Sequence, residues 1–175
     1  RRDDYDQEAD VEAAILSQAV GAPVRLQWSR AEEFVWAQYR PPQVVTLRAG
    51  ISADGAIAGL AGNVWTAVRG VHPEPMIAGM ALMDTPYTVG PLSVEGFDAG
   101  PVLRTGYMRN VYSGYIIFAL ESFMDEISYA TKVDPFEFRL NHLDDERAID
   151  VINAATDKVG WIPHTEPSGA GIGIS

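Results

Sequence analysis

The strongest constraint on the fold is a long amphipathic helix predicted for residues 113–131. Its apolar side chains recur at helical spacing, so one face of the helix must pack against another element. A glycine-punctuated loop that carries Arg109 leads directly into this helix. A tight loop that ends at a helix N-terminus is well suited to hold a polar or anionic group. The apolar stripe consists of Ile116, Leu120, Phe123 and Ile127, widened by Ile117 and Met124.

Further helices are expected both after and before this one in the sequence. Asp134, Pro135 and Glu137 have the order of an N-cap, a first-turn proline and a first-turn acid. A last helix is expected from Asp145 or Glu146 to Val159, with Gly160 as its stop. Near the start of the chain, residues 6–20 also have helical spacing. Ser29, followed by Glu32 three residues later, predicts a capping box for a short helix.

Strand-like patterns occupy most of the first half. The residues between 51 and 57 include Ala53, Asp54 and Gly55, which favour a hairpin turn between two such runs. Gly59 and Gly62 are candidates for β-bulges in the second run. We therefore expect an α+β fold with antiparallel strands in the first half and helices grouped in the second. The strand-like runs are residues 23–28, 44–51, 57–68 and 87–97.

The composition of the 175 residues excludes several classes of protein. A net charge of −11 argues against a nucleic-acid surface, which requires clustered lysine and arginine. With no cysteine, the chain itself provides no ligand for an iron–sulfur cluster and no thiolate for zinc. No apolar run is long enough to span a bilayer. We expect no metal site, because His72, His142 and His164 lack ligand spacing.

Three acids on the long helix permit two interpretations. Glu121, Asp125 and Glu126 lie within about one and a half turns of each other, and paired carboxylates can transfer protons or bind metal. Such acids also commonly pair with arginine or cap neighbouring turns, and we favour this structural interpretation. No residue of this chain is assigned a catalytic role.

Several segments together resemble a known family. They are residues 104–111 (RTGYMRNV), 118–126 (FALESFMDE), 133–139 (VDPFEFR) and 159–161 (VGW), preceded by residues 23–30 (PVRLQWSR) and 39–41 (YRP). In this order they resemble the molybdopterin-binding large subunit of the xanthine dehydrogenase and aldehyde oxidase family. The branch that includes isoquinoline 1-oxidoreductase and nicotinate dehydrogenase is the most similar.

The resemblance implies an oxidoreductase that hydroxylates an N-heteroaromatic or aldehyde carbon with oxygen from water. It implies molybdopterin as the cofactor, with the cytosine dinucleotide form as one option. Electrons would leave through an iron–sulfur small subunit, which agrees with the absence of cysteine here. The base that serves family members lies in a later segment, so we expect the isolated 175-residue chain to have no turnover.

The resemblance also implies roles for individual residues. Arg109 matches the loop arginine beside the substrate pocket. Tyr112 stands where glycine is usual, and Ile116 stands where asparagine is frequent; both departures leave open a non-catalytic binding or assembly module that kept only the fold. Gly79–Asp84 provides no second pocket arginine, which disfavours a purine. The implied substrate-binding residues are Arg109, Asp3 and Tyr112, and the implied cofactor-binding residues are Arg1, Arg2, Met108 and Asn110.

Both ends of the sequence have the character of internal positions. The chain opens on Arg1-Arg2, which in the family follows a glycine-rich cofactor loop, and no apolar targeting segment is visible in the given sequence. Residues 1–165 are expected to form part of a molybdopterin-binding domain, and residues 166–175 a glycine-rich connector to a following segment. The cellular compartment stays open between cytoplasm and periplasm.

Overall fold

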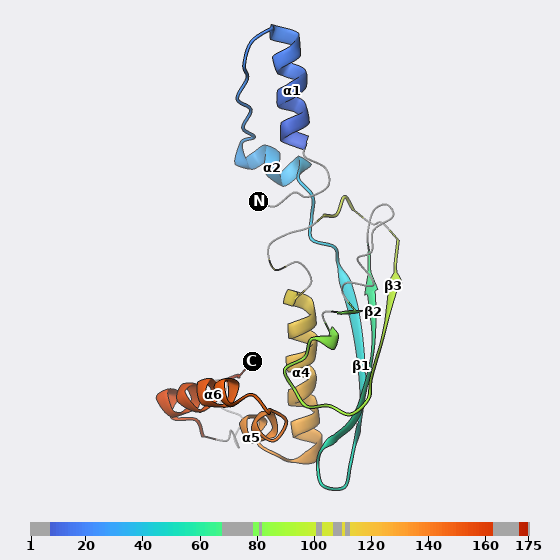
Figure 1. The fold of residues 1–175 in the computed structure, drawn as a ribbon, viewed down its shortest axis with the longest axis vertical. Helices are drawn as coiled ribbons and strands as arrows, with labels where there is room; N and C mark the ends of the chain where they lie inside the picture. Colours follow the sequence, from blue (N-terminus) through green and yellow to red (C-terminus); the bar gives the residue numbers. More distant parts are fainter. Residues whose placement is uncertain are drawn as a thin grey trace.

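The fold is that of a computed structural model of the chain (Figure 1). It describes residues 8–67, 79–80, 82–100, 103–106, 110, 113–162 and 172–174. In chain order its elements are α1 (Glu8–Val20), α2 (Arg30–Trp36), β1 (Gln43–Ile51), β2 (Ile57–Thr66), β3 (Leu92–Asp98), α4 (Ser113–Thr131), α5 (Pro135–Leu140) and α6 (Glu146–Val159). The predicted α+β class is confirmed.

The three strands form one sheet in the order β1-β2-β3. β1 and β2 make the predicted antiparallel hairpin, and Gly55 adopts a φ of 89° in its turn, where glycine is favoured. β3 pairs with β2 in parallel, so the expectation of antiparallel strands holds for only one of the two pairings. A parallel pairing cannot be closed by a tight turn, so β2 and β3 need the longer connection that separates them in the sequence.

Two local expectations for the strands are wrong. The register shifts where Gly50 pairs with Gly59 and Ile51 pairs with Ile57, so β2 has an extra residue beside Gly59, as expected there. The pairing is regular through Gly62, so the second expected bulge is absent. Gly62 instead leaves space for Leu82, whose side chain would overlap a β-carbon at position 62. The expected strand at residues 87–97 begins only at Leu92.

A single helix covers one face of the sheet. α4 lies across the inner face of the hairpin, with β2 contributing Leu60 and Val64 to the shared core (Figure 1). The alternation along β1 and β2 explains this packing, because every second residue of each strand is directed to the same side. The buried core consists of Ile57, Leu60, Val64, Leu82, Tyr87, Ile116, Leu120, Met124, Ile127, Phe138 and Leu143.

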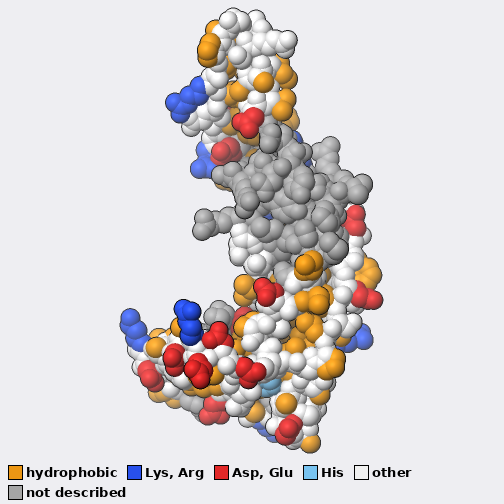
Figure 2. Space-filling model, viewed as in Figure 1, with side chains coloured by type: hydrophobic (Ala, Val, Ile, Leu, Met, Phe, Trp, Pro, Cys, Tyr) orange, Lys and Arg blue, Asp and Glu red, His pale blue; other side chains and the backbone are white. Residues whose placement is uncertain are grey.

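The two C-terminal helices begin where the sequence predicts. Asp134 caps α5 and Asp145 caps α6, each with its carboxylate accepting a backbone N–H of the first turn. Gly160 ends α6 in the left-handed conformation, with a φ of 65°. Acidic side chains gather on the surface over this region, which shows where part of the net negative charge lies (Figure 2).

α1 and α2 form an arm beyond one end of the sheet (Figure 1). The predicted capping box is present at α2, where Ser29 and Glu32 bond each other's backbone N–H. Residues 23–28 are extended but belong to no strand of the described sheet, which corrects the expected strand. Their alternating half-buried residues follow α1 instead, and Trp28 Nε1 donates to Glu12 at 2.8 Å.

Among the described residues, no helix combines sufficient length with sufficient apolar character to cross a bilayer.

Candidate functional site

The loop that precedes α4 is attached to the segment that precedes β1. Tyr39 and Thr105 form a parallel bridge between the two segments. The Tyr39 N–H donates to the Arg104 carbonyl at 2.8 Å, and the Gly106 N–H donates to the Tyr39 carbonyl at 3.0 Å. These bonds fix the start of the loop at the end of the sheet nearest α2.

Gly106 is required at this junction for space. A β-carbon at this position would overlap Oε1 of Gln38, whose side chain is buried. The backbone of the loop therefore lies directly on the Gln38 amide. Any larger residue at position 106 would displace either the loop or the amide.

Hydrogen-bond donors and a positive charge lie together at the first turn of α4. Asn110 has a φ of 71°, in the left-handed region, and its carbonyl accepts the Ser113 N–H at 2.8 Å. A β-carbon at Gly114 would lie 3.5 Å from Asn110 Nδ2 and 3.9 Å from Arg40 Nη1. The first turn contains no acidic residue. The positive end of the helix dipole, the amide and the guanidinium therefore lie together, an arrangement that favours anionic or polar groups.

Arg40 also contacts an aromatic ring of this turn. Its guanidinium carbon lies 5.7 Å from the centroid of Tyr115, within the range of a cation–π contact. Burial raises the pKa of the Tyr115 hydroxyl, and the nearby positive charge of Arg40 opposes part of that rise. The phenol therefore stays protonated and can donate a hydrogen bond at neutral pH.

Two polar side chains at this end of the sheet have buried atoms without partners. Gln43 and Thr66 are register partners in the hairpin. Both amide atoms of Gln43 and the hydroxyl of Thr66 are inaccessible to solvent, and none has a hydrogen-bond partner among the described residues. An unsatisfied buried polar group costs about 1–3 kcal/mol, so such a cluster is unusual unless a further molecule or segment provides the bonds.

The structure describes one of the seven residues assigned to the site from the sequence. Asn110 lies beside the first turn of α4, next to Gly114 and Arg40. The other six lie outside the described residues, so their predicted roles stay predictions. Those six are Arg1, Arg2, Asp3, Met108, Arg109 and Tyr112.

Other residues of this junction were not singled out from the sequence. Gln38 and Arg40 precede β1, and only the contacts of Gln38 with Gly106 and of Arg40 with the first turn of α4 reveal their place in the junction. Gln43 and Thr66 did carry a signal, because each stands at the end of an inward-facing row that is otherwise apolar or glycine. Ile116, identified as a departure from the family, is 1% exposed and belongs to the core, so packing accounts for it.

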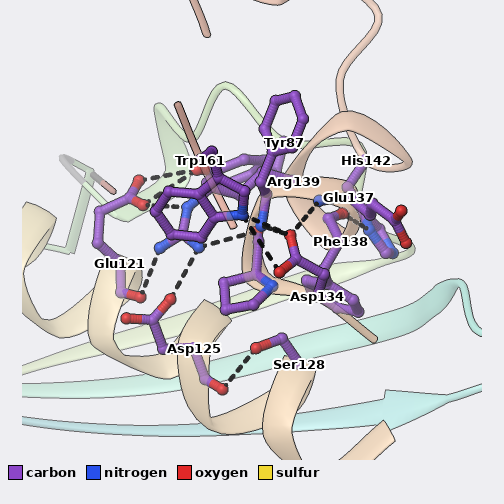
Figure 3. Close-up of polar contacts among 12 residues, drawn as sticks. Tyr87, Glu121, Asp125, Ser128, Asp134, Glu137, Phe138, Arg139, His142 and Trp161 are labelled. Carbon is purple, nitrogen blue, oxygen red and sulfur yellow. Dashed lines mark hydrogen bonds and ion pairs between the residues drawn. The ribbon is translucent and has the colours of Figure 1, made fainter. Parts of the chain in front are cut away.

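Two of the three acids of α4 have the structural role that we favoured (Figure 3). Arg139 of α5 is completely buried, and its Nε donates to Glu121 at 2.9 Å while Nη1 donates to Asp125 at 2.8 Å. Tyr87 donates to the Glu121 carboxylate at 3.0 Å. Glu126 is exposed. Glu121 and Asp125 therefore join α4 to α5 and are not arranged for acid–base chemistry.

His142 is likewise part of the core. Its Nε2 accepts the Ile57 N–H at 3.1 Å, so Nδ1 carries the proton and donates to the Phe138 carbonyl at 2.7 Å. The ring thus connects β2 to α5. Within the described residues, no group of three His, Cys, Asp or Glu side chains is placed to hold a metal ion.

Two bacterial proteins are similar to the chain over most of its length. A nicotinate dehydrogenase subunit from Pseudomonas putida is 35% identical over 169 residues, which are 89% of this chain and 14% of that protein. The beta subunit of isoquinoline 1-oxidoreductase from Brevundimonas diminuta is 25% identical over 94% of this chain and 22% of that protein. The chain thus spans less than a quarter of the length of either relative.

Solved structures share the fold. Quinoline 2-oxidoreductase from Pseudomonas putida superposes with a TM-score of 0.73 at 20% identity, covering 86% of this chain and 22% of that one. Aldehyde oxidoreductase from Desulfovibrio gigas gives a TM-score of 0.73 at 16% identity, over 87% and 18% of the two chains. The family model of the molybdopterin cofactor-binding domain matches residues 6–143. The chain therefore belongs to the molybdopterin cofactor-binding domain family.

Proposed function

We propose that this chain is an internal segment of a molybdenum hydroxylase large subunit, whose parent oxidises an N-heteroaromatic or aldehyde carbon with oxygen from water. The observation that carries the proposal is the family match over residues 6–143, with the loop–α4 junction inside it. The names of the relatives support the substrate class, since two of them are a nicotinate dehydrogenase and an isoquinoline oxidoreductase. In this proposal residues 1–165 are part of the cofactor-binding domain and residues 166–175 are a connector.

The described residues at the junction fit a polar, anionic cofactor. Orphaned polar atoms at Gln43 and Thr66, the acid-free start of α4 and the Arg40 guanidinium all favour a group with acceptors and negative charge. Molybdopterin, when bound, supplies the redox chemistry, and the protein supplies placement and electrostatics.

Individual residues then have defined tasks. We assign the cofactor to Arg1, Arg2, Met108 and Asn110, and the left-handed backbone of Asn110 beside α4 supports its part. We assign Arg109 to orienting the substrate, with Asp3 and Tyr112 bordering the same pocket. A guanidinium holds a carboxylate or carbonyl through paired hydrogen bonds, which would present the reacting carbon in one orientation.

Two finer features of the parent belong to the same proposal. The cofactor is the cytosine dinucleotide form of molybdopterin, and electrons pass to a separate iron–sulfur chain. Both relatives are named as single subunits of their enzymes, which supports an assembly of several chains. The complete absence of cysteine agrees with clusters held by another chain.

Metal analysis of the full-length parent tests the proposal. We expect about one molybdenum per chain, together with oxidation of nicotinate, isoquinoline or an aldehyde by an artificial electron acceptor. A parent that purifies together with its iron–sulfur partner and contains no molybdenum would instead support a non-catalytic module that kept the fold, which the Tyr112 departure motivates.

Substitution of Arg109 tests the substrate assignment. Arg109→Gln in the parent should lower kcat/KM for an anionic substrate roughly tenfold to a hundredfold, the effect of losing a charge-assisted hydrogen bond. Arg48→Gln is the matched control, because Arg48 is exposed on the outer face of β1. Equal effects of the two substitutions on kcat/KM would show that Arg109 does not belong to the substrate pocket.

A further inference from the structure

We propose that Gln43 and Thr66 form a recognition pair for a lactam edge, that is, a ring N–H beside a ring carbonyl. The proposal rests on the proposed function, because it places this ligand next to the cofactor-binding junction. It adds two residues for which neither the sequence motifs nor the family match provides a role.

The two side chains are held side by side on one face. Gln43 and Thr66 are opposite each other in the antiparallel register of β1 and β2, so their Cα atoms are close neighbours. Gln43 continues the inward row of Val45 and Leu47, and Thr66 continues that of Val64. Both side chains therefore project to the face that α4 covers.

The chemistry of the pair points to a ligand and not to internal structure. A glutamine and a threonine on adjacent strands can bond each other, yet here the amide N–H₂, the amide oxygen and the hydroxyl all remain unpaired among the described residues. Thr66 is completely buried, so water from the bulk does not serve it. The amide offers a donor and an acceptor in one plane, which is the complement of a lactam edge.

The position of the pair connects it to the junction. β1 begins and β2 ends at the end of the sheet nearest α2, and α4 begins toward that same end (Figure 1). Pro42 accepts the Ala67 N–H at 3.1 Å there, which keeps the two strand ends together. Tyr39, four residues before Gln43, holds the start of the loop that leads to α4. A planar ring under this loop would meet the pair along its edge.

Two molecules present such an edge. The pterin ring of molybdopterin contains a ring N–H beside a carbonyl. Hydroxylation of a carbon next to a ring nitrogen also yields a lactam as the stable tautomer of the product. The shared chemistry is the lactam edge, and the experiment separates its two sources.

The test uses Gln43→Leu and Thr66→Val in the full-length parent, because both remove hydrogen-bonding atoms at nearly constant volume. Gln27→Leu and Thr46→Val are matched controls, since both positions are exposed. Thr66→Ser retains the hydroxyl that Thr66→Val removes. The readouts are molybdenum and pterin per purified chain, the melting temperature, and the rise in melting temperature caused by 2-pyridone compared with pyridine, which lacks the lactam edge.

If the pterin is the source, both variants should retain roughly fivefold less pterin and molybdenum than the controls, with Thr66→Ser near wild type. If the product is the source, cofactor content should be normal and the 2-pyridone shift should disappear. If the product is the source, the melting temperature without 2-pyridone should be unchanged or raised, because removal of orphaned atoms alone is neutral or stabilising. If the pterin is the source, the same should hold when cofactor-free proteins are compared, since loss of a bound cofactor by itself lowers the melting temperature.

Normal cofactor content and a normal 2-pyridone shift in both variants would overturn the lactam assignment and leave the proposed function intact. A wild-type parent without molybdenum would overturn the proposed function. In a parent without molybdenum, the rise in melting temperature caused by 2-pyridone alone tests the lactam assignment. The absence of that rise would overturn the lactam assignment as well.

Discussion

At the scale of single residues, Arg139 determines how the helices assemble. Burial of its guanidinium opposes the charged form, but hydrogen bonds to Asp125 and Glu121 outweigh that effect and raise the pKa of Arg139 above its ordinary value. The charge is therefore permanent, and its partners are required. A further bond to the Pro135 carbonyl at 3.1 Å ties the same side chain to the start of α5 (Figure 3).

Removal of this charge should be costly. Arg139→Met should lower the free energy of unfolding by about 3 kcal/mol, because it leaves the Glu121 carboxylate without its buried cationic partner. Arg30→Met is the control, because the Arg30–Glu33 pair is exposed, and it should change the same quantity by less than about 1 kcal/mol. Chemical denaturation of both variants measures the difference, and similar losses would show that burial of the pair is unimportant.

Tyr87 should make stability sensitive to alkaline pH. Burial raises the pKa of its hydroxyl, and the negative charge of Glu121 raises it further. The folded pKa therefore exceeds the unfolded value of 10.0, so the stabilisation is complete below that pH and is lost as pH rises through and beyond it. Tyr87→Phe should unfold with a smaller decline in stability above this pH than wild type. If the free energy of unfolding declined equally with pH in the two proteins, the assignment of this effect to Tyr87 would be wrong.

At the scale of elements, Asp134 joins two helices by one carboxylate. It caps α5 through the backbone N–H groups of Phe136 and Glu137, and it also accepts the Trp161 indole N–H at 3.2 Å. Trp161 follows the end of α6. The cap thus fixes the start of one helix and the end of the next.

This double role predicts unequal effects of two similar substitutions. Asp145→Ala removes only an N-cap of α6 and should cost about 1 kcal/mol. Asp134→Ala removes a cap and the bond to Trp161, so it should cost about twice as much. It should also shift the fluorescence emission of Trp161, which Asp145→Ala should not do. Equal costs with unchanged emission would show that the indole bond does not contribute.

At the scale of the whole molecule, the α1–α2 arm differs from the rest of the fold. Apolar side chains are exposed on it, as Figure 2 shows, and α1 has no fully buried residue from Ala9 onward. The α4–sheet unit has an extended core in contrast. Local stability follows local burial, so the two parts should open at very different rates.

Hydrogen exchange measures this contrast. In the 175-residue chain, backbone amides of α1 should exchange much faster than those of α4 and β2. In the longer parent that we propose, further polypeptide would be available to cover Ile15 and Val20, and the amides of α1 should become protected. Equal protection of α1 in both proteins would indicate that the arm is stable on its own.

The sequence predicts the local elements well, for physical reasons that act within a few residues. Apolar spacing alone is sufficient for α4, and side-chain oxygens at Asp134 and Ser29 are sufficient for the starts of α5 and α2. The same patterns fail at residues 23–28, where the alternation is real but its partner is a helix. Alternation indicates that one face of the segment is covered, but it does not identify the element that covers it.

What the sequence determined by itself is therefore the α+β class, the helix boundaries, the hairpin and the family, because these depend on periodicity, caps and ordered motifs. Only the tertiary structure decided that β3 pairs in parallel, that Arg139 pairs with two acids of α4, and that Gln43 and Thr66 lie together without partners among the described residues. Each of these requires contact between segments far apart in the chain. Such contacts depend on how the elements pack as a whole, which no local pattern encodes.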